Sequence, residues 1–215
     1  MKKLLPALLL MLVICQCSPV KREKRQPTPW DQYPEKFTKE YISESAIRLI
    51  DYVPDHEFNP SIKPAFGEQY FSLLEEAWAV PVVDIDGIGE NEWLYYFLTG
   101  NDGDEYTDRT KTVLEAMMMD DWNSYAKMEY LGREHDIVMH FENGDWTINN
   151  FDGTQDDLAI YIRRQRQNLR SIEWESFSDG LVNEMKGYMA EDEVIAWVSD
   201  FKARVEAYFA KYPDR

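Results

Sequence analysis

From residue 38 the apolar positions recur at helical spacing, which predicts two successive helices. Thr38 can cap the first helix, with Phe37 before it and Ile42 inside it packing as a hydrophobic staple. Asn59-Pro60-Ser61 is typical of a helix start and predicts a second helix that ends near Pro81. The inner stripes of the two helices predict one helical layer: Ile42, Ala46, Leu49, Ile50 and Val53, then Phe66, Tyr70, Leu73, Leu74 and Ala77.

From Val82 onward the pattern changes to short apolar pieces separated by Asp, Gly and Asn, which favours strands. Asn143-Gly144 is favoured in a two-residue type I′ turn, because both positions need positive φ. Such a turn pairs Glu142 with Asp145 and Phe141 with Trp146, and it separates a buried face from a solvated one. The predicted strands are Lys111–Met117, Tyr125–Leu131, His135–Glu142 and Asp145–Phe151. The predicted buried face holds Ile137, Met139, Phe141, Trp146 and Ile148, and the solvated face His140, Glu142, Asp145, Thr147 and Asn149.

The helical period returns after the strands. Asp156–Leu169 is predicted to close the main domain, with Leu158, Ile162 and Leu169 inside. Beyond it Phe177, Leu181, Met185 and Tyr188 are helically spaced, and a long apolar stripe runs from Val194 to Tyr212. We expect the domain's own sheet or helices to bury this stripe. The pattern predicts an α+β domain at residues 35–170, in which a curved antiparallel sheet packs on N-terminal helices, and a C-terminal helical extension at residues 171–215.

The first 17 residues are typical of a secretory signal. Lys2 and Lys3 precede the apolar run Leu4–Ile14, which is too short to span a bilayer, and Cys15-Gln16-Cys17-Ser18 follows it. Two processing routes stay open: signal peptidase cleavage after Cys17, or attachment of a lipid to Cys17, for which Gln16 makes a poor lipobox. Residues 18–34 have no apolar periodicity and predict an extended spacer.

Arg22-Glu23-Lys24-Arg25 resembles a furin-type cleavage site, which would imply a eukaryotic secretory path and a mature chain beginning at Gln26. However, both cysteines lie at positions 15 and 17, and small secreted eukaryotic domains usually contain disulfides. A bacterial envelope protein, in the periplasm or at the outer membrane, fits this composition better.

The net charge of −17 makes nucleic acid an unsuitable partner, because phosphate binding depends on clustered Lys and Arg. The basic run Arg163-Arg164-Gln165-Arg166 stands at the end of a predicted helix, where cations complement the helix dipole. Contact with a membrane is therefore expected only through a lipid anchor.

The stretch Val138–Phe151 resembles the closing hairpin of bacterial envelope proteins with a nuclear-transport-factor-2-like (cystatin-like) α+β fold, a group annotated only as a domain of unknown function. Tyr70-Phe71-Ser72-Leu73-Leu74, Val83–Gly87 and Asp157–Ile162 resemble further parts of that group, and the similarity covers residues 43–166. The resemblance implies an exported, often lipid-anchored, cone-shaped domain whose relatives mostly lack an assigned activity. Gly87 and Asn91-Glu92 depart from the group's pattern, and no catalytic residue is carried over.

No metal or cofactor is predicted. The histidines are His56, His135 and His140, and the last two point to opposite faces of one predicted strand. Asp84–Glu92 begins like a calcium loop, but Ile88 and Tyr95 occupy ligand positions. No motif of a serine or cysteine nucleophile is present in the mature region.

We therefore expect an envelope protein, non-enzymatic, that binds a partner protein or small ligand in a concavity between sheet and helices. The aromatic residues expected to line it are Trp78, Trp93, Tyr96 and Trp146. One alternative is a hydrolase or isomerase with Asp84 and Asp86 as general acid and base. Another is an acidic inhibitor or immunity-type protein that neutralises a basic partner.

Overall fold

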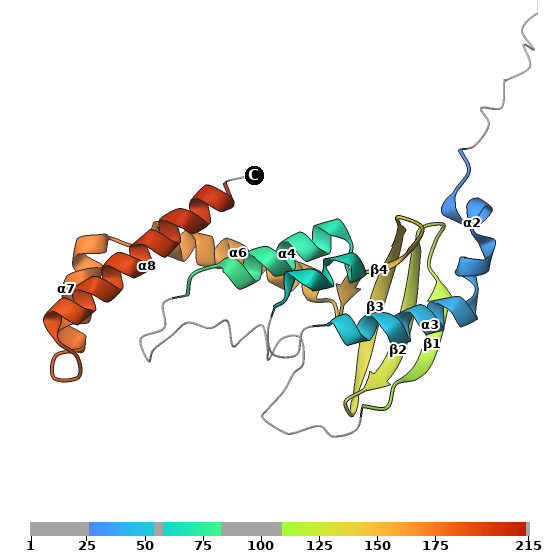
Figure 1. The fold of residues 1–215 in the computed structure, drawn as a ribbon, viewed down its shortest axis with the longest axis horizontal. Coiled ribbons are helices and arrows are strands. Elements are labelled where there is room, and N and C mark those ends of the chain that lie inside the picture. The colour runs from blue at the N-terminus through green and yellow to red at the C-terminus, as the bar shows by residue number, and fades with distance from the viewer. Residues whose placement is uncertain (1–25, 54–57, 83–108, 214–215) are drawn as a thin grey trace, which may run out of the picture.

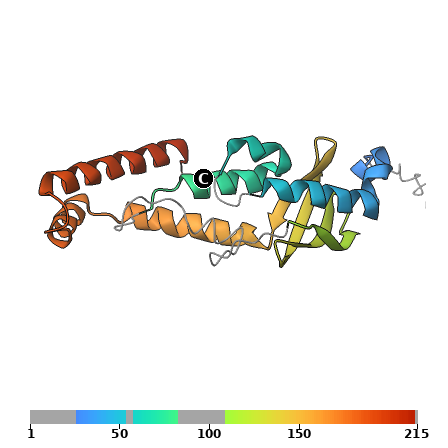
Figure 2. The same cartoon turned by 60° about the horizontal axis from the view of Figure 1, so that its bottom comes forward.

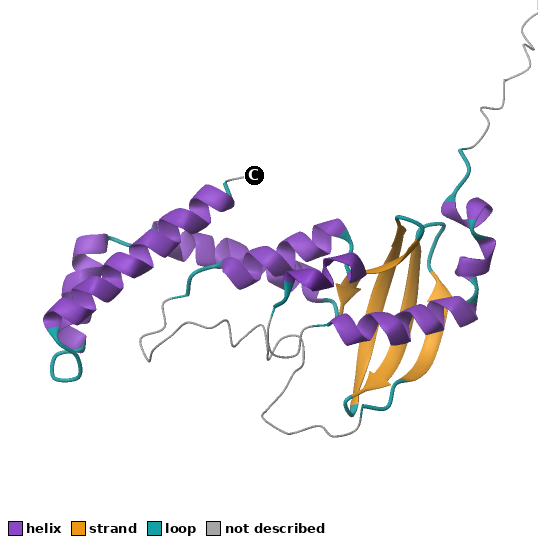
Figure 3. Ribbon diagram, in the orientation of Figure 1, coloured by secondary structure: helices purple, strands orange, loops and turns teal. Residues whose placement is uncertain are grey.

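The computed structural model describes residues 26–53, 58–82 and 109–213, and these form a mixed α+β fold (Figures 1 and 3). Asp84, Asp86, Trp93, Tyr96, His56 and Cys17 lie outside the described residues. None of the helices within the described ranges combines the length and apolarity needed to cross a bilayer.

One antiparallel sheet contains the four described strands in the order β1-β2-β3-β4. The strands are β1 (Thr112–Met118), β2 (Asn123–Tyr130), β3 (Arg133–Glu142) and β4 (Asp145–Phe151). All four strand predictions are confirmed, with each strand end within two residues of the expected position. Because consecutive strands are neighbours, each connection is a short turn.

The β3–β4 turn has the predicted geometry, with φ of 53° at Asn143 and 85° at Gly144. Glu142 pairs with Asp145 and Phe141 with Trp146, and the predicted buried face is confirmed. A register shift between Val138 and Met139 then moves the pairing of Val138 to Asn150. Thr147 was predicted to be solvated and is only 6% exposed. That prediction was wrong because Gly67, at the start of a helix, packs against its side chain.

Helix α3 (Lys39–Leu49) crosses the buried face of the sheet (Figures 1 and 2). Thr38 caps it as predicted, since its Oγ1 accepts from the backbone N–H of Tyr41 at 3.2 Å. Ahead of it lie the short helices α2 (Pro29–Gln32), at the end of the expected spacer, and η1 (Pro34–Phe37); η2 (Ile50–Tyr52) follows α3. The chain before α3 contacts the hairpin, where the indole N–H of Trp146 donates to the Lys36 carbonyl at 2.8 Å.

The second predicted helix divides into two pieces. Asn59 caps a 3₁₀ helix, η3 (Pro60–Ala65), and α4 (Glu68–Ala79) begins only after Gly67. The pieces are separate because Phe66 forms a bridge with Ile148 of β4, and the Gly67 N–H donates to the Ile148 carbonyl at 2.8 Å. Pro64 also lacks the N–H that a continuous α-helix would need.

Helices α4 and α6 (Thr154–Arg170) lie side by side and lead from the sheet to a hairpin of α7 (Trp174–Glu184) and α8 (Glu191–Lys211), which gives the molecule an elongated shape (Figures 1 and 2). The apolar stripe of α8 is buried as expected, by helices rather than by the sheet. One cluster joins Val80 and Leu169 to Phe201, Val205 and Tyr208; another joins Leu181 to Val194 and Val198. The predicted helical spacing of Phe177, Leu181, Met185 and Tyr188 was wrong at its end, because α7 ends at Glu184 and Tyr188 lies beyond it.

A buried hydrogen bond joins α4 to α6. The hydroxyls of Tyr70 and Thr154 lie 2.6 Å apart, and Tyr70 is fully buried. This burial raises the pKa of Tyr70 to about 12, because the phenolate would lose its hydration.

The positive φ of Gly144 predicts a matched pair of glycine substitutions. An added Cβ meets no atom within 4 Å at Gly144 or at Gly180, which lies inside α7. Gly144→Ala should cost about 1 kcal/mol, because alanine disfavours φ of 85°. Gly180→Ala should raise the free energy of unfolding by about 0.8 kcal/mol, because alanine is the better helix former. Urea unfolding measures both, and equal stability of Gly144→Ala and the native chain would contradict the assigned turn.

The raised pKa of Tyr70 predicts a loss of stability in alkali. The folded state favours the neutral phenol, so this contribution is complete below about pH 10 and is lost as the pH rises to about 12. The rise of the Tyr70 pKa from 10 to about 12 corresponds to roughly 3 kcal/mol of stability. Tyr70→Phe should reduce the fall in unfolding free energy over this window by about that amount, and it should cost about 1 kcal/mol at pH 7 through the lost hydrogen bond. Urea unfolding at each pH tests this, and parallel pH profiles for the two proteins would contradict it.

Candidate functional site

A cleft of about 970 Å³ opens between the end of α3, η3 and the β3–β4 turn. Its polar lining includes Arg48, Lys63, Glu68, Glu142 and Asp145, and Tyr52 adds a partly exposed aromatic ring. Both signs of charge are therefore present in its walls.

Asp145 organises one wall of this cleft. Its carboxylate accepts from Arg48 at 3.0 Å, from the Tyr41 hydroxyl at 3.1 Å and from the Trp146 backbone N–H at 2.9 Å. These bonds connect α3 to the hairpin, and they leave Asp145 satisfied by its own chain. Its role in the cleft is to position Arg48.

A second cleft, of about 660 Å³, lies between the first turns of α4 and the outer face of β3 and β4. It shares Glu68 and Glu142 with the first cleft, so the two adjoin, and we call them together the groove. The remaining lining residues of the second cleft are Gly67, Gln69, Ser72, Leu73, Glu76, His140 and Asn149. Most of these are polar, which suits a ligand rich in hydrogen-bonding groups.

Gly67 determines how closely α4 approaches the sheet. A Cβ at this position would lie 3.2 Å from Oδ1 of Asn149 and 3.6 Å from Oγ1 of Thr147. With glycine, the backbone N–H reaches the Ile148 carbonyl and α4 begins directly at the edge of β4. A backbone hydrogen bond therefore connects the two walls of the groove, α4 and β4.

His140 is a polar group of the groove that can both donate and accept hydrogen bonds. Its Nδ1 lies 2.9 Å from Oδ1 of Asn123, whose Nδ2 donates to both carboxylate oxygens of Asp120, at 3.0 and 2.8 Å. Because Asp120 directs the amide nitrogen away from the imidazole, Asn123 presents its oxygen and His140 donates from Nδ1. The bond from Asn123 also lowers the pKa of the Asp120 carboxyl.

We call the hydrogen bonds that connect Asp120, Asn123 and His140 the His140 relay. They determine the hydrogen-bonding role of the second ring nitrogen of His140. In the neutral ring Nε2 is an acceptor, and it makes no hydrogen bond within the part of the chain that the structure describes. The Trp122 ring stacks on the imidazole with centroids 6.0 Å apart and planes 14° apart, which restricts its rotation. The groove thus contains an imidazole nitrogen that accepts in the neutral ring, together with the carboxylates of Glu68, Glu76 and Glu142.

This arrangement presents mainly hydrogen-bond acceptors. Ser72 lines the same cleft, but its hydroxyl makes no hydrogen bond with His140, so these two residues are not a paired nucleophile and base. Over the described ranges, no three His, Cys, Asp or Glu side chains converge as a metal site would require.

His135 lies on the opposite face of β3, as predicted, and is buried. Its Nδ1 lies 2.8 Å from Asp152 and its Nε2 lies 3.3 Å from the Tyr130 carbonyl. With both nitrogens engaged, this histidine connects the β2–β3 turn to the end of β4 and is not available to a ligand.

Of the aromatic residues expected to line a pocket, the structure describes Trp78 and Trp146. Trp146 borders the first cleft but is 1% exposed and belongs to the core. Trp78 packs beside Phe58, with ring centroids 6.0 Å apart, and lines neither cleft. The structure therefore does not bring these two tryptophans together. Trp93, Tyr96, Asp84, Asp86 and Cys17 are outside the described residues.

The sequence reasoning missed the groove as a site, although it placed His140 and Glu142 on one face of the hairpin. Arg48, Lys63 and Glu68 come from segments far from the hairpin in sequence, and nothing in the local pattern indicates that they lie opposite it. The predicted hairpin register was the one signal that could have identified part of the lining, the residues of β3 and β4.

Comparison with known proteins identifies no relative. No family model matches the chain, and neither a curated protein nor a solved structure matches it significantly.

Proposed function

We propose that the protein is a non-enzymatic binding protein of the bacterial cell envelope, and that the groove holds a small ligand or a segment of a partner protein. The observation that carries the proposal is the His140 relay, which orients the imidazole in a polar cleft lined by three glutamate carboxylates. Acceptors arranged in this way favour a ligand with amine or hydroxyl donors.

The finer fold belongs to the same proposal. A four-stranded antiparallel sheet with α3 across one face is compatible with the cone-shaped, cystatin-like domain that the hairpin motif resembles. The groove lies at the edge of this sheet, between β4 and α4. It would be the ligand-binding concavity of the domain.

The proposed location rests on residues 1–17. Their charged start, apolar run and small-residue exit support export, and Cys17 is the residue that a lipid would modify. Residues 18–28 would then connect the anchor to α2.

Ligand binding in the groove can be tested with a panel of primary amines, polyols and lysine-rich peptides, observed through the ring resonances of His140. A true ligand should shift them saturably. Ser72→Trp should weaken binding about tenfold or more, because the indole fills the second cleft. Ile160→Trp, at an exposed position of α6 that lines neither cleft, is the matched control and should bind normally. Absence of saturable shifts, or equal binding by Ser72→Trp, would refute this site.

Export can be tested separately by the intact mass of the protein purified from the envelope of its native cells. We expect either a lipid-modified Cys17 at the new N-terminus or a chain that begins at Ser18. Cys17→Ser should retain export, and it should release the protein from the membrane if the lipid is present. A mature chain beginning at Gln26 would overturn the bacterial assignment.

A further inference from the structure

The far end of the α7–α8 hairpin exposes apolar side chains. Tyr188 is 88% exposed, Met189 is 41% exposed, and Ile195, in the second turn of α8, is 49% exposed. We call residues 185–195 the tip. It lies at the opposite end of the elongated molecule from α2 (Figure 1). Because Tyr188 buries so little of its surface, the folded chain gains little stability from it.

The tip is an ordered turn. The N–H groups of Tyr188 and Met189 both donate to the Met185 carbonyl, at 2.9 and 3.1 Å, and Lys186 bridges to Met189. Gly187 supplies the φ of 97° that this turn requires. The Ala190 N–H donates to the Glu193 side chain at 3.2 Å, which fixes the start of α8. Tyr188 is therefore presented in a defined place, so binding through it would cost little ordering entropy.

The hairpin beneath the tip is a rigid support. Leu181, Val194 and Val198 form its buried cluster. Aromatic rings pack between the helices, with Phe177 of α7 beside Phe201 of α8 at a centroid distance of 6.3 Å. An apolar tip on such a support is typical of a residue that inserts into a complementary surface.

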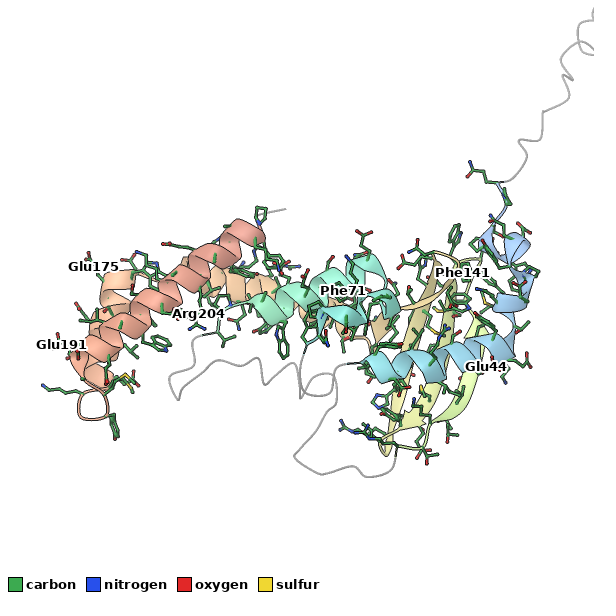
Figure 4. All side chains as sticks on the ribbon, viewed as in Figure 1. Glu44, Phe71, Phe141, Glu175, Glu191 and Arg204 are labelled. Carbon is green, nitrogen blue, oxygen red and sulfur yellow. The ribbon has the colours of Figure 1, made fainter. Side chains whose placement is uncertain are left out.

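Negative charge lies along the hairpin and at the tip. Between residues 174 and 193 one basic side chain, Lys186, accompanies six exposed acidic ones. Glu184, Glu191, Asp192 and Glu193 lie in or beside the tip, whereas Glu175 and Asp179 lie farther along α7 (Glu175 and Glu191 are labelled in Figure 4). The helix dipole favours the acidic residues in the first turns of α7 and α8, but it disfavours Glu184 in the last turn of α7. Helix stability therefore does not account for this charge as a whole.

The negative charge at the tip restricts which kind of partner can bind there. Two copies of an acidic tip would repel each other, and an anionic lipid surface would repel it as well. We propose that the tip docks on a partner protein, inserting Tyr188 and Met189 into an apolar socket whose rim carries Lys and Arg. The four carboxylates in or beside the tip steer the approach, and Tyr188 supplies the anchor that becomes buried in the complex. This surface is separate from the groove and does not depend on what the groove binds.

Site-specific photo-crosslinking in the native cells tests the proposal. Tyr188→p-benzoylphenylalanine keeps an aromatic ring at an exposed position, and the same residue at Ile160 of α6 is the positional control. We expect position 188, and not position 160, to crosslink to one protein, at a peptide that contains Lys or Arg. Glu184→Lys combined with Asp192→Lys should lower the adduct yield about tenfold, whereas Glu206→Lys, an exposed acid elsewhere on α8, should change it little.

The purified partner then allows affinity to be measured. Tyr188→Ser should weaken binding about tenfold or more, and added salt should weaken the native pair more than the Glu184→Lys/Asp192→Lys variant. Circular dichroism confirms that the variants fold, which is expected because the altered side chains are exposed. A crosslink to lipid or to a second copy, no crosslink above the control, or a crosslink insensitive to charge reversal would overturn the proposal.

Discussion

The two-residue turn at Asn143-Gly144 is the constraint on which the rest of the structure depends. It sets the pairing of β3 with β4, and the same pairing directs Met139 and Phe141 into the core and His140 and Glu142 into the groove. A slip by one residue would exchange the two sets, exposing the apolar side chains and burying the charged ones. Burial of the apolar side chains therefore stabilises the β3–β4 register, and this register positions the side chains of the groove. No separate device is needed to orient His140 toward the outer face, although Asn123 and Asp120 are needed to define which of its nitrogens accepts.

Helix α4 connects the groove to the C-terminal hairpin. Its first turn forms a groove wall at Gly67 and Glu68, and its last turns meet α6 and α8 at Glu76. One oxygen of Glu76 accepts from Arg166 at 2.6 Å and from the Tyr208 hydroxyl at 2.9 Å, and Arg166 also donates to the Tyr212 carbonyl at 2.8 Å. Burial, and then the bond to Glu76, raises the pKa of Tyr208. A mostly buried ion pair is costly unless its remaining groups are also bonded, and here α8 supplies those bonds. The hairpin is thus fixed to the body by directional polar contacts as well as by apolar burial.

The elements that were predictable from the sequence are those whose signals are local. The turn dipeptide, the alternation along β3 and β4, the Thr38 cap and the stripe of α8 each lie within a few residues, so they could be interpreted without knowledge of the fold. The break between η3 and α4 could not, because it depends on Phe66 pairing with Ile148, far away in sequence. The same reason explains Thr147, whose burial comes from Gly67. The groove combines these non-local contacts, which is why the sequence indicated only the part of its lining that the hairpin supplies. Tyr188 continued a helical spacing that the chain leaves at Glu184, and its exposure became evident only from the position of that helix end.

The placement of charge and apolar surface along the molecule bears on the proposed attachment to a membrane. The described chain begins near α2, and the tip lies at the other end, beyond the paired helices α4 and α6 (Figure 1). A lipid on Cys17 would attach the protein at the α2 end and leave the tip as the part farthest from that membrane. An exposed Tyr188 and Met189 near a bilayer would tend to enter it, but the four carboxylates in or beside the tip would oppose contact with anionic lipid. These carboxylates would therefore have two effects with one physical origin: they would oppose insertion of the apolar tip into an anionic membrane, and they would attract a basic partner to the same residues.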